Sequence, residues 1–364
     1  MPTTLAELLT RHGPDYLVRH GGRLPPAQRR ALTAILRCRT PAMGGHRCAC
    51  AECGEQVYRF HSCNHRLCPR CGGADTHVWL ERQLSRLLPV PYFLVTFTVP
   101  QQLRLLARDH ADWFLDTLFE ESAATLQEIA ASPRHLGAEL GFFGVYHSWS
   151  RTLGMHPHIH YIVPAGGLRP DHRAWRRTRQ PDFLLPVEVL SARFCSRIEE
   201  RLRATHPHVH AAISSSVWRN DWVVHSQSAG SGEAALKYLS RYVFRTAFGG
   251  ERHVHHHDDG SDRVSFQYID SDTQQPRVCT LAGDTFIGRF LQHALPAGLH
   301  RIRYFGWMHP SAKRRRLIVE TLVQALFSVR AHTAPAHSPP WHRCCPHCGA
   351  FSLVITATFP RAPP

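Results

Sequence analysis

Two pairs of residues in this sequence have types and spacings that suit metal-assisted nucleophilic chemistry. His158 and His160 flank Ile159 in an apolar run. Alternate side chains of a strand share a face, so both imidazoles would point the same way and could bind a divalent ion that keeps open coordination positions. Tyr238 and Tyr242 would lie one turn apart on a helix. A metal that polarises a phosphodiester beside a tyrosine that attacks phosphorus predicts strand cleavage through a 5′-phosphotyrosine.

Three cations surround the tyrosine pair in the sequence. Lys237, Arg241 and Arg245 lie within one helical stretch with the two phenols, and Tyr238, Arg241, Tyr242 and Arg245 share one face. Neighbouring cations favour a phenolate, which is the form that a tyrosine nucleophile requires. The alternative is that the two rings simply pack, as aromatic residues at this spacing often do.

A second His-rich segment repeats the pattern at His206-Pro-His208-Val-His210. The first copy, His156 to His160, lies in an apolar strand and is followed by Gly166-Gly167. The second copy follows an Arg-rich helix and precedes a run of small residues. We therefore expect the metal at the first copy and a surface segment at the second.

Two CxxC knuckles, Cys50/Cys53 and Cys68/Cys71, lie in a segment with little apolar periodicity. Each knuckle presents two thiolates, and together they predict one tetrahedral structural zinc ion. Spare donors allow a second ion or an exchanged ligand: His46, Cys48, His61, Cys63 and His65. A single knuckle, Cys345/Cys348, follows near the C-terminus, where it either borrows ligands such as His342 and His347 or binds nothing.

The composition fits a soluble protein with a polyanionic partner. The 43 basic and 28 acidic residues give a net charge of +15, and all but Lys237 and Lys313 of the basic residues are arginines. Arginine suits bidentate phosphate contacts, although a bias in codon usage would also explain its excess. We see no secretory signal and no apolar run long enough for a membrane span, and we expect a bacterial cytoplasmic, nucleoid-associated protein that binds DNA.

The elements that must position these residues can be read from periodicity and turn signals. We expect strands over 92–99, 141–149 and 158–163. We expect helices over 103–131, 186–203, 233–248 and 284–293, and a hairpin over 264–281.

Several blocks of the chain resemble the rolling-circle insertion-sequence transposases of the two-tyrosine HUH class. The blocks are Gly44-Gly-His46, Ser62-Cys63-Asn-His-Arg66-Leu-Cys68-Pro, Leu88-Pro-Val-Pro-Tyr-Phe93, Thr96-Phe-Thr-Val-Pro100, His147-Ser-Trp149, His156-Pro-His-Ile-His160, Tyr238-Leu-Ser-Arg-Tyr242, Phe290-Leu-Gln-His-Ala-Leu-Pro and His300-Arg-Ile-Arg-Tyr304-Phe-Gly306. The resemblance covers nearly the whole chain.

The resemblance implies a central His strand in an antiparallel sheet with helices on one face. It makes His158 and His160 ligands of a catalytic Mg²⁺ or Mn²⁺ and makes Tyr238 and Tyr242 the nucleophiles. A third ligand is expected: His156 shares the face, and His147 could reach from the neighbouring strand. Where family members often carry a histidine, two residues after the second tyrosine, this chain has Phe244.

The sequence therefore predicts an α+β protein with an N-terminal zinc domain. We expect a zinc-binding DNA-binding domain over 1–88, a nuclease domain over 89–250, an extension of it over 251–330, and a Pro/His-rich tail over 331–364. The predicted function is a DNA transposase that acts on single-stranded or extruded transposon ends and on target DNA. The alternatives are a zinc-finger DNA-binding protein without catalysis and a metal-dependent hydrolase that uses water.

Overall fold

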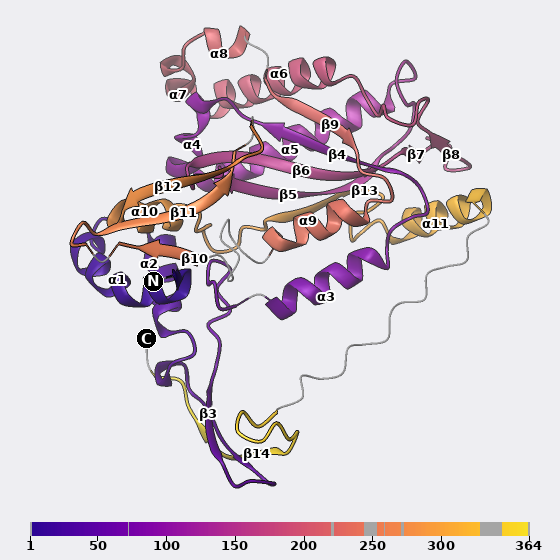
Figure 1. Cartoon of the computed structure of the whole chain (residues 1–364). Helices are drawn as coiled ribbons and strands as arrows, with labels where there is room; N and C mark the ends of the chain where they lie inside the picture. The colour runs from indigo at the N-terminus through magenta and orange to yellow at the C-terminus, as the bar shows by residue number, and fades with distance from the viewer. Residues whose placement is uncertain are drawn as a thin grey trace. The chain divides into compact units, whose positions relative to one another are not determined.

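The chain folds into two units, each assembled from segments that are distant in sequence. The computed structural model describes residues 2–71, 73–219, 222–243, 253–257, 259–270, 273–327 and 344–362 (Figure 1). One unit comprises residues 1–77, 244–294 and 334–364, and the other comprises residues 78–243 and 295–333.

The second unit is built on a five-stranded antiparallel sheet with the order β13-β5-β6-β4-β9. Its strands are β4 (Tyr92–Thr98), β5 (Gly141–Trp149), β6 (Met155–Pro164), β9 (Val224–Ser228) and β13 (Ile302–Gly306). β-Branched and aromatic residues dominate β4 and β5, as is typical of strands with covered faces. The strand that carries the histidine pair, β6, is the central strand, as expected.

Helices α5 (Ala111–Ala131) and α6 (Val187–Thr205) cover one face of this sheet (Figure 1). Phe97 of β4 and Phe194 of α6 meet edge to face with ring centroids 5.0 Å apart, and both are fully buried. The helix expected over 103–131 is interrupted: it consists of a 3₁₀ turn, η2 (Gln101–Leu103), then α4 (Leu106–Asp109) and α5.

The opposite face of the sheet also carries a helix, which differs from the expectation of helices on one face. Helix α9 (Glu233–Val243) packs against β5, with Leu236 and Leu239 fully buried. Its amphipathic sequence gives one apolar stripe for the sheet and leaves Tyr238 at the margin, 45% exposed. The helix was expected to reach residue 248, but residues 244–250 lie outside the described part of the chain.

The first unit contains a helical part and a small three-stranded part, which we call the finger. Helices α1 (Leu5–His20), α2 (Pro26–Arg37) and α10 (Gly283–Leu291) pack together, and a four-stranded sheet accompanies them in the order β1-β10-β11-β12. Its strands are β1 (Pro2–Thr4), β10 (His253–His256), β11 (Arg263–Ile269) and β12 (Pro276–Ala282). Strands β11 and β12 form the hairpin that was expected over 264–281.

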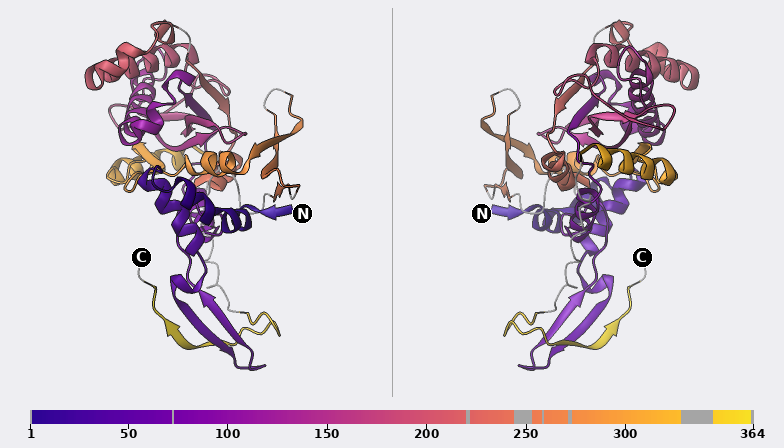
Figure 2. Two further views of the ribbon diagram at one scale, coloured as in Figure 1. Left: turned by 90° about the vertical axis from the view of Figure 1, so that its left-hand side faces the viewer. Right: turned by 90° about the vertical axis from the view of Figure 1, so that its right-hand side faces the viewer.

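The finger is a three-stranded antiparallel sheet with the order β14-β2-β3. Strands β2 (Gly45–Cys50) and β3 (Gln56–Phe60) form a hairpin, and β14 (Leu353–Phe359) runs along β2 (Figure 2). Among the described residues, the apolar cluster of the finger consists of Cys48, Cys50, Cys345 and Leu353, with Val57 packed against it. So small a core does not hold a sheet by itself.

The remaining described elements are short or peripheral to these sheets. They are η1 (Pro41–Met43), α3 (Gly73–Leu84), β7 (Gly166–Leu168), β8 (Trp175–Arg177), α7 (Pro207–Ala212), α8 (Ser216–Arg219) and α11 (Lys313–Phe327). Among the described residues, no helix is long and apolar enough to cross a membrane.

The two units do not follow the expected linear domains. The expected extension over 251–330 is divided between them, with its hairpin and α10 in the first unit and β13 and α11 in the second. The expected tail over 331–364 contributes β14 to the first unit. Strand pairing between distant segments causes both differences, because β13 completes the edge beside β5 and β14 the edge beside β2.

Candidate active site

Three histidines converge on the face of the sheet opposite α5 and α6. His147 of β5 pairs across the strands with His158 of β6, and the side chain of His160 follows two residues later on the same face. One donor nitrogen of each ring lies within 4.8 Å of the other two. The ring centroid of His147 is 5.3 Å from that of His158 and 4.7 Å from that of His160. The third donor therefore comes from the neighbouring strand.

His156, the other expected ligand, is not part of this triad. It lies on β6 two residues before His158, and its Nδ1 accepts a hydrogen bond of 2.9 Å from the Arg104 guanidinium. Its ring centroid lies 5.0 Å from that of His158, but His156 is not among the three histidines whose donor nitrogens all lie within 4.8 Å of one another. Of the two candidates for a third ligand, the structure therefore groups His147, and not His156, with His158 and His160.

Hydrogen bonds fix how two of the rings present their nitrogens. His158 Nδ1 lies 2.7 Å from the backbone carbonyl oxygen of His156. Because a carbonyl oxygen can only accept a hydrogen bond, Nδ1 carries the proton and Nε2 keeps its lone pair. His160 Nδ1 lies 2.8 Å from Thr96 Oγ1 on β4. Such partners orient imidazole ligands toward a metal.

Burial keeps the triad neutral. Desolvation lowers the pKa of His158 to about 4 and that of His160 to about 3, and it holds the pKa of His147 well below its ordinary value. Burial, followed by the charge of Arg104, also lowers the pKa of His156. At pH 7 the three rings of the triad are therefore uncharged, which is the form that binds a metal.

The donor set fits a divalent transition ion. Three imidazole nitrogens on one side leave the other coordination positions to water or substrate oxygen. Imidazole ligands suit first-row transition ions better than Mg²⁺, which prefers oxygen ligands. Of the two expected ions, Mn²⁺ fits these residues better.

Tyr238 lies beside the triad. Its ring meets the imidazole of His160 edge to face, with centroids 6.4 Å apart and an interplanar angle of 86°. The half-exposed ring on α9 is accessible to a large substrate. Lys237, expected to act on the phenol, is instead ion-paired with Glu233 one turn earlier on the helix.

The other residues expected at the nucleophile are only partly described. The backbone of Arg241 and Tyr242 is part of α9, one turn beyond Lys237 and Tyr238. Their side chains lie outside the described part of the structure. Arg245 and Phe244 lie outside the described residues.

The second His-rich segment has a different structure. Residues 207–212 form the short helix α7, so His208 and His210 do not share a strand face. His208 is exposed, and His210 lies 3.3 Å from a carboxylate oxygen of Glu199. This agrees with the expected surface segment.

Sequence reasoning did not identify Thr96 and Arg104 as partners of the histidines. Thr96 lies directly opposite His160 in the β4–β6 register. The alternation of β4 places Thr96 and Thr98 on one face at the end of the strand, and Phe93, Val95 and Phe97 on the other. The polar residues on one face of the strand next to the His strand were the sequence signal that could have identified Thr96 as a partner of a histidine.

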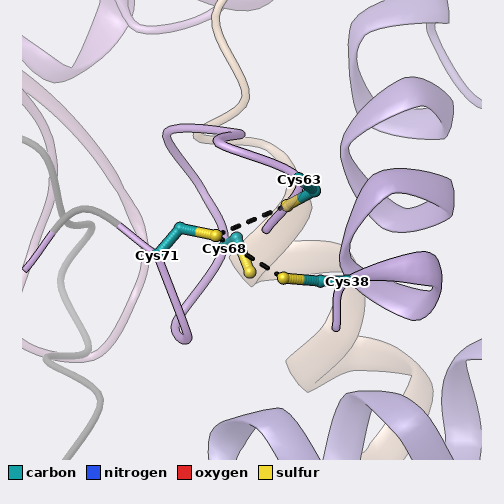
Figure 3. Close-up of side chains that lie close together, drawn as sticks. All are labelled: Cys38, Cys63, Cys68 and Cys71. Atoms are coloured by element: carbon teal, nitrogen blue, oxygen red, sulfur yellow. Dashed lines mark hydrogen bonds between the residues drawn. The ribbon is translucent and has the colours of Figure 1, made fainter. Parts of the chain in front are cut away.

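Eight of the twelve cysteines form two separate four-thiol clusters, both within the first unit. The base cluster consists of Cys38, Cys63, Cys68 and Cys71, whose sulfurs point toward one another (Figure 3). Cys71 Sγ lies 3.5 Å from Cys38 Sγ and 3.7 Å from Cys63 Sγ. A tetrahedral zinc ion with Zn–S bonds of about 2.3 Å requires sulfurs about 3.8 Å apart, so the cluster fits zinc.

The tip cluster consists of Cys50, Cys53, Cys345 and Cys348. Cys50 Sγ lies 3.6 Å from Cys348 Sγ, and Cys53 Sγ lies 3.7 Å from Cys345 Sγ. A hydrogen bond with the Ser352 hydroxyl, 3.3 Å away, lowers the pKa of Cys50 to about 6. The expectation that Cys50, Cys53, Cys68 and Cys71 share one ion is therefore corrected.

The length of the hairpin explains the correction. Cys50 and Cys53 flank the turn at its tip, whereas Cys38 precedes β2 and Cys63 follows β3 at its base. A five-residue strand such as β3 spans about 17 Å, so one ion cannot reach both ends.

Comparison with known proteins agrees with this architecture. Residues 8–99 match the family described as "Transposase zinc-binding domain", and residues 141–316 match the family described as "Putative transposase". The first range contains the base cluster, and the second contains the histidine triad and Tyr238. No solved structure matches the chain.

Two curated relatives align over most of their length. The chain is 39% identical over 331 residues to "Putative transposase y4qJ" of Sinorhizobium fredii, covering 86% of this chain and 82% of the relative. It is 30% identical over 312 residues to the "Transposase for insertion sequence element IS801" of Pseudomonas savastanoi pv. phaseolicola, covering 80% of this chain and 73% of the relative.

A mixed α+β fold that combines a zinc-binding domain with this second domain defines a transposase, a DNA-binding and DNA-cleaving class of enzyme. The chain belongs to the IS91/IS801 family of insertion-sequence transposases, which are rolling-circle transposases.

Proposed function

We propose that this transposase cuts and rejoins single DNA strands through a 5′-phosphotyrosine intermediate formed at the site of His147, His158 and His160. The observation that carries the proposal is the position of Tyr238 beside a triad of neutral imidazoles, with its ring 6.4 Å from that of His160. A nucleophile and a metal-binding set on one face of one sheet are the components that phosphodiester transfer requires.

In the proposed step, Tyr238 Oη attacks the phosphorus of a phosphodiester. The new P–O bond to tyrosine forms as the bond from phosphorus to the 3′ oxygen breaks. The phenol loses its proton, and the departing strand ends in a free 3′-hydroxyl after taking up a proton. The phosphodiester energy is conserved in the tyrosine ester, so a 3′-hydroxyl can reverse the step at another DNA end without ATP.

When bound, a divalent ion would supply the positive charge that stabilises the phosphate oxygens in this step. His147, His158 and His160 would hold it, and Thr96 would orient His160. We propose Mn²⁺ or Mg²⁺ as the ion, with Mn²⁺ binding more tightly to three imidazoles.

We assign the second transfer to Tyr242, which follows Tyr238 by one helical turn on α9. Arg241 and Arg245, from the same segment of the chain, would favour the phenolate form and contact phosphate oxygens. Two nucleophiles allow one strand end to be held covalently while the other is being joined.

The proposed substrates are single-stranded or extruded transposon ends and target DNA. The net charge of +15, carried almost entirely by arginine, supports salt-dependent binding to phosphates. Binding to DNA would also associate the protein with the nucleoid. We assign recognition of the DNA to the N-terminal zinc-binding domain, where Arg47, Arg59, Arg66 and Arg70 lie among the cysteines.

A covalent-adduct assay tests the proposal. The full-length protein is incubated with a labelled single-stranded end oligonucleotide and Mn²⁺, and the attached nucleotide is mapped by peptide analysis. We expect a denaturation-resistant adduct on Tyr238 or Tyr242 and its absence from the Tyr238→Phe/Tyr242→Phe variant. An adduct that persists in this double variant contradicts the nucleophile assignment. Cleavage without any adduct, which leaves a free 5′-phosphate, would indicate a hydrolase that uses water.

A further inference from the structure

The tip cluster joins two parts of the chain that are almost 300 residues apart. Cys50 and Cys53 come from the turn of the β2–β3 hairpin, and Cys345 and Cys348 come from the C-terminal segment 344–362. The matched families extend over residues 8–99 and 141–316, so the C-terminal cysteines lie outside both. Their role has to be inferred from the structure.

The two knuckles have the same backbone structure. In the first, the Cys50 carbonyl accepts a hydrogen bond of 3.0 Å from the Gly54 N–H, and the Cys50 N–H donates to the Glu55 carbonyl. In the second, the Cys345 carbonyl accepts a bond of 2.9 Å from the Gly349 N–H, and the Cys345 N–H donates to the Ala350 carbonyl.

Each knuckle closes on a glycine in the left-handed region. Gly54 has φ +72° and Gly349 has φ +74°, a conformation that other residues rarely adopt. Two CxxC turns with the same hydrogen bonds and the same terminal glycine present their thiols in equivalent ways, and here they face each other. Paired knuckles of this kind are typical of structural zinc sites.

The spacing of the sulfurs fits one tetrahedral ion. The Cys50–Cys348 and Cys53–Cys345 distances of 3.6 and 3.7 Å are close to the approximately 3.8 Å edge of a ZnS₄ tetrahedron. All four sulfurs lie within 4.8 Å of one another. Distances near 2 Å, as in disulfides, are absent among these four thiols.

Contacts beyond the sulfurs hold the C-terminal segment against the hairpin. Arg59 of β3 donates a hydrogen bond of 3.0 Å to the Cys344 carbonyl. The Ala51 N–H donates to the Ser352 carbonyl, and β14 pairs with β2 from Leu353 opposite Cys50 to Phe359 opposite Gly45. The segment is thus placed in register with the thiols of the hairpin.

We propose that Cys50, Cys53, Cys345 and Cys348 bind a second structural zinc ion that fastens the C-terminal segment to the tip of the N-terminal finger. The finger then holds two zinc ions, one at its base and one at its tip. Because the finger has almost no apolar core, the tip ion supplies much of the free energy that orders it. The finger is complete only in a chain that contains residues 344–362, and this conclusion does not depend on the catalytic mechanism.

The experiment counts zinc in the purified full-length protein after a brief wash with a weak chelator. We expect two zinc ions per chain in the unmodified protein and one in the Cys345→Ser/Cys348→Ser variant. Cys344→Ser is the matched control: Cys344 is the exposed neighbour of Cys345 and lies outside both clusters, so this variant should keep two.

A conservative variant separates loss of a ligand from loss of folding. Cys348→His should keep two zinc ions, since a Cys₃His set also binds zinc tetrahedrally. In that variant the visible spectrum of the Co²⁺-substituted protein should differ from that of the unmodified protein, because one thiolate is replaced. One zinc ion in the unmodified chain, or two in the Cys345→Ser/Cys348→Ser variant, would overturn the proposal.

Discussion

The Tyr238 ring stands edge-on to the imidazole of His160, with centroids 6.4 Å apart. One residue comes from α9 and the other from the central strand β6, 78 positions earlier in the chain. The contact places a half-exposed phenol next to the triad, of which His147 is buried and His158 and His160 are partly buried. Our predictions about catalysis depend on this relationship.

Replacing Tyr238 by phenylalanine should remove the nucleophile and leave the metal site intact. We expect single-turnover cleavage of an end oligonucleotide to fall by at least about 100-fold, because the ring remains but the attacking oxygen is lost. The affinity for Mn²⁺, measured by calorimetry, should be unchanged. Tyr304→Phe on β13 serves as the control and should cleave at the normal rate.

The assignment of the third ligand can be tested by comparing two histidines. His147→Ala should weaken Mn²⁺ binding by at least about 100-fold, because it removes one of three donors. Loss of a hydrogen-bond partner of a metal-bound histidine alone already costs about 10–100-fold. His156→Ala should weaken it by less than about 10-fold, because His156 is bonded to Arg104 and lies outside the triad. The reverse order of these effects would restore His156 as the ligand.

Thr96 should act through His160. Thr96→Val keeps the shape and volume of the side chain but loses the hydroxyl 2.8 Å from His160 Nδ1. We expect Mn²⁺ affinity to fall by about 10–100-fold, as for other partners of metal-bound histidines. Thr98→Val, on the same face of β4, is the matched control. Equal metal affinity in both variants would show that Thr96 does not orient His160.

The base cluster should bind zinc independently of the second unit, which carries the histidine triad. Cys68→Ser should remove one zinc ion per chain and weaken DNA binding by the N-terminal domain, whereas Mn²⁺ binding at the triad should persist. Cys48→Ala is the control, because Cys48 is buried in the finger but belongs to neither cluster. Loss of zinc from the control, with none lost from Cys68→Ser, would contradict the ligand set.

The core beneath the sheet can be tested by its stability. Phe194→Ala removes a fully buried ring that packs against Phe97 and Trp222. The free energy of unfolding of the second unit should fall by about 3–5 kcal/mol in chemical denaturation. Val189→Ala, at an exposed position of the same helix, should change it by no more than about 0.5 kcal/mol. A small effect at Phe194 would mean that the core tolerates the cavity.

Much of the fold and of the chemistry was determined by the sequence alone. Apolar and β-branched runs predicted β4, β5 and β6, and the alternation of β6 placed His158 and His160 on one face, because side-chain direction in a strand depends only on local backbone geometry. The helical spacing of Tyr238 and Tyr242 followed in the same way. The net charge and the CxxC turns pointed to DNA and to zinc.

Only the tertiary structure decided which distant residues share a site. The β5–β6 register placed His147 beside His158 and His160. The length of the hairpin separated the two N-terminal knuckles, so that Cys50/Cys53 lie against Cys345/Cys348. Spacing along the chain cannot specify such partners, because they are selected by strand pairing between segments that are up to 300 residues apart. The sequence therefore determines the local chemistry, whereas the topology determines which distant residues lie together in each cluster.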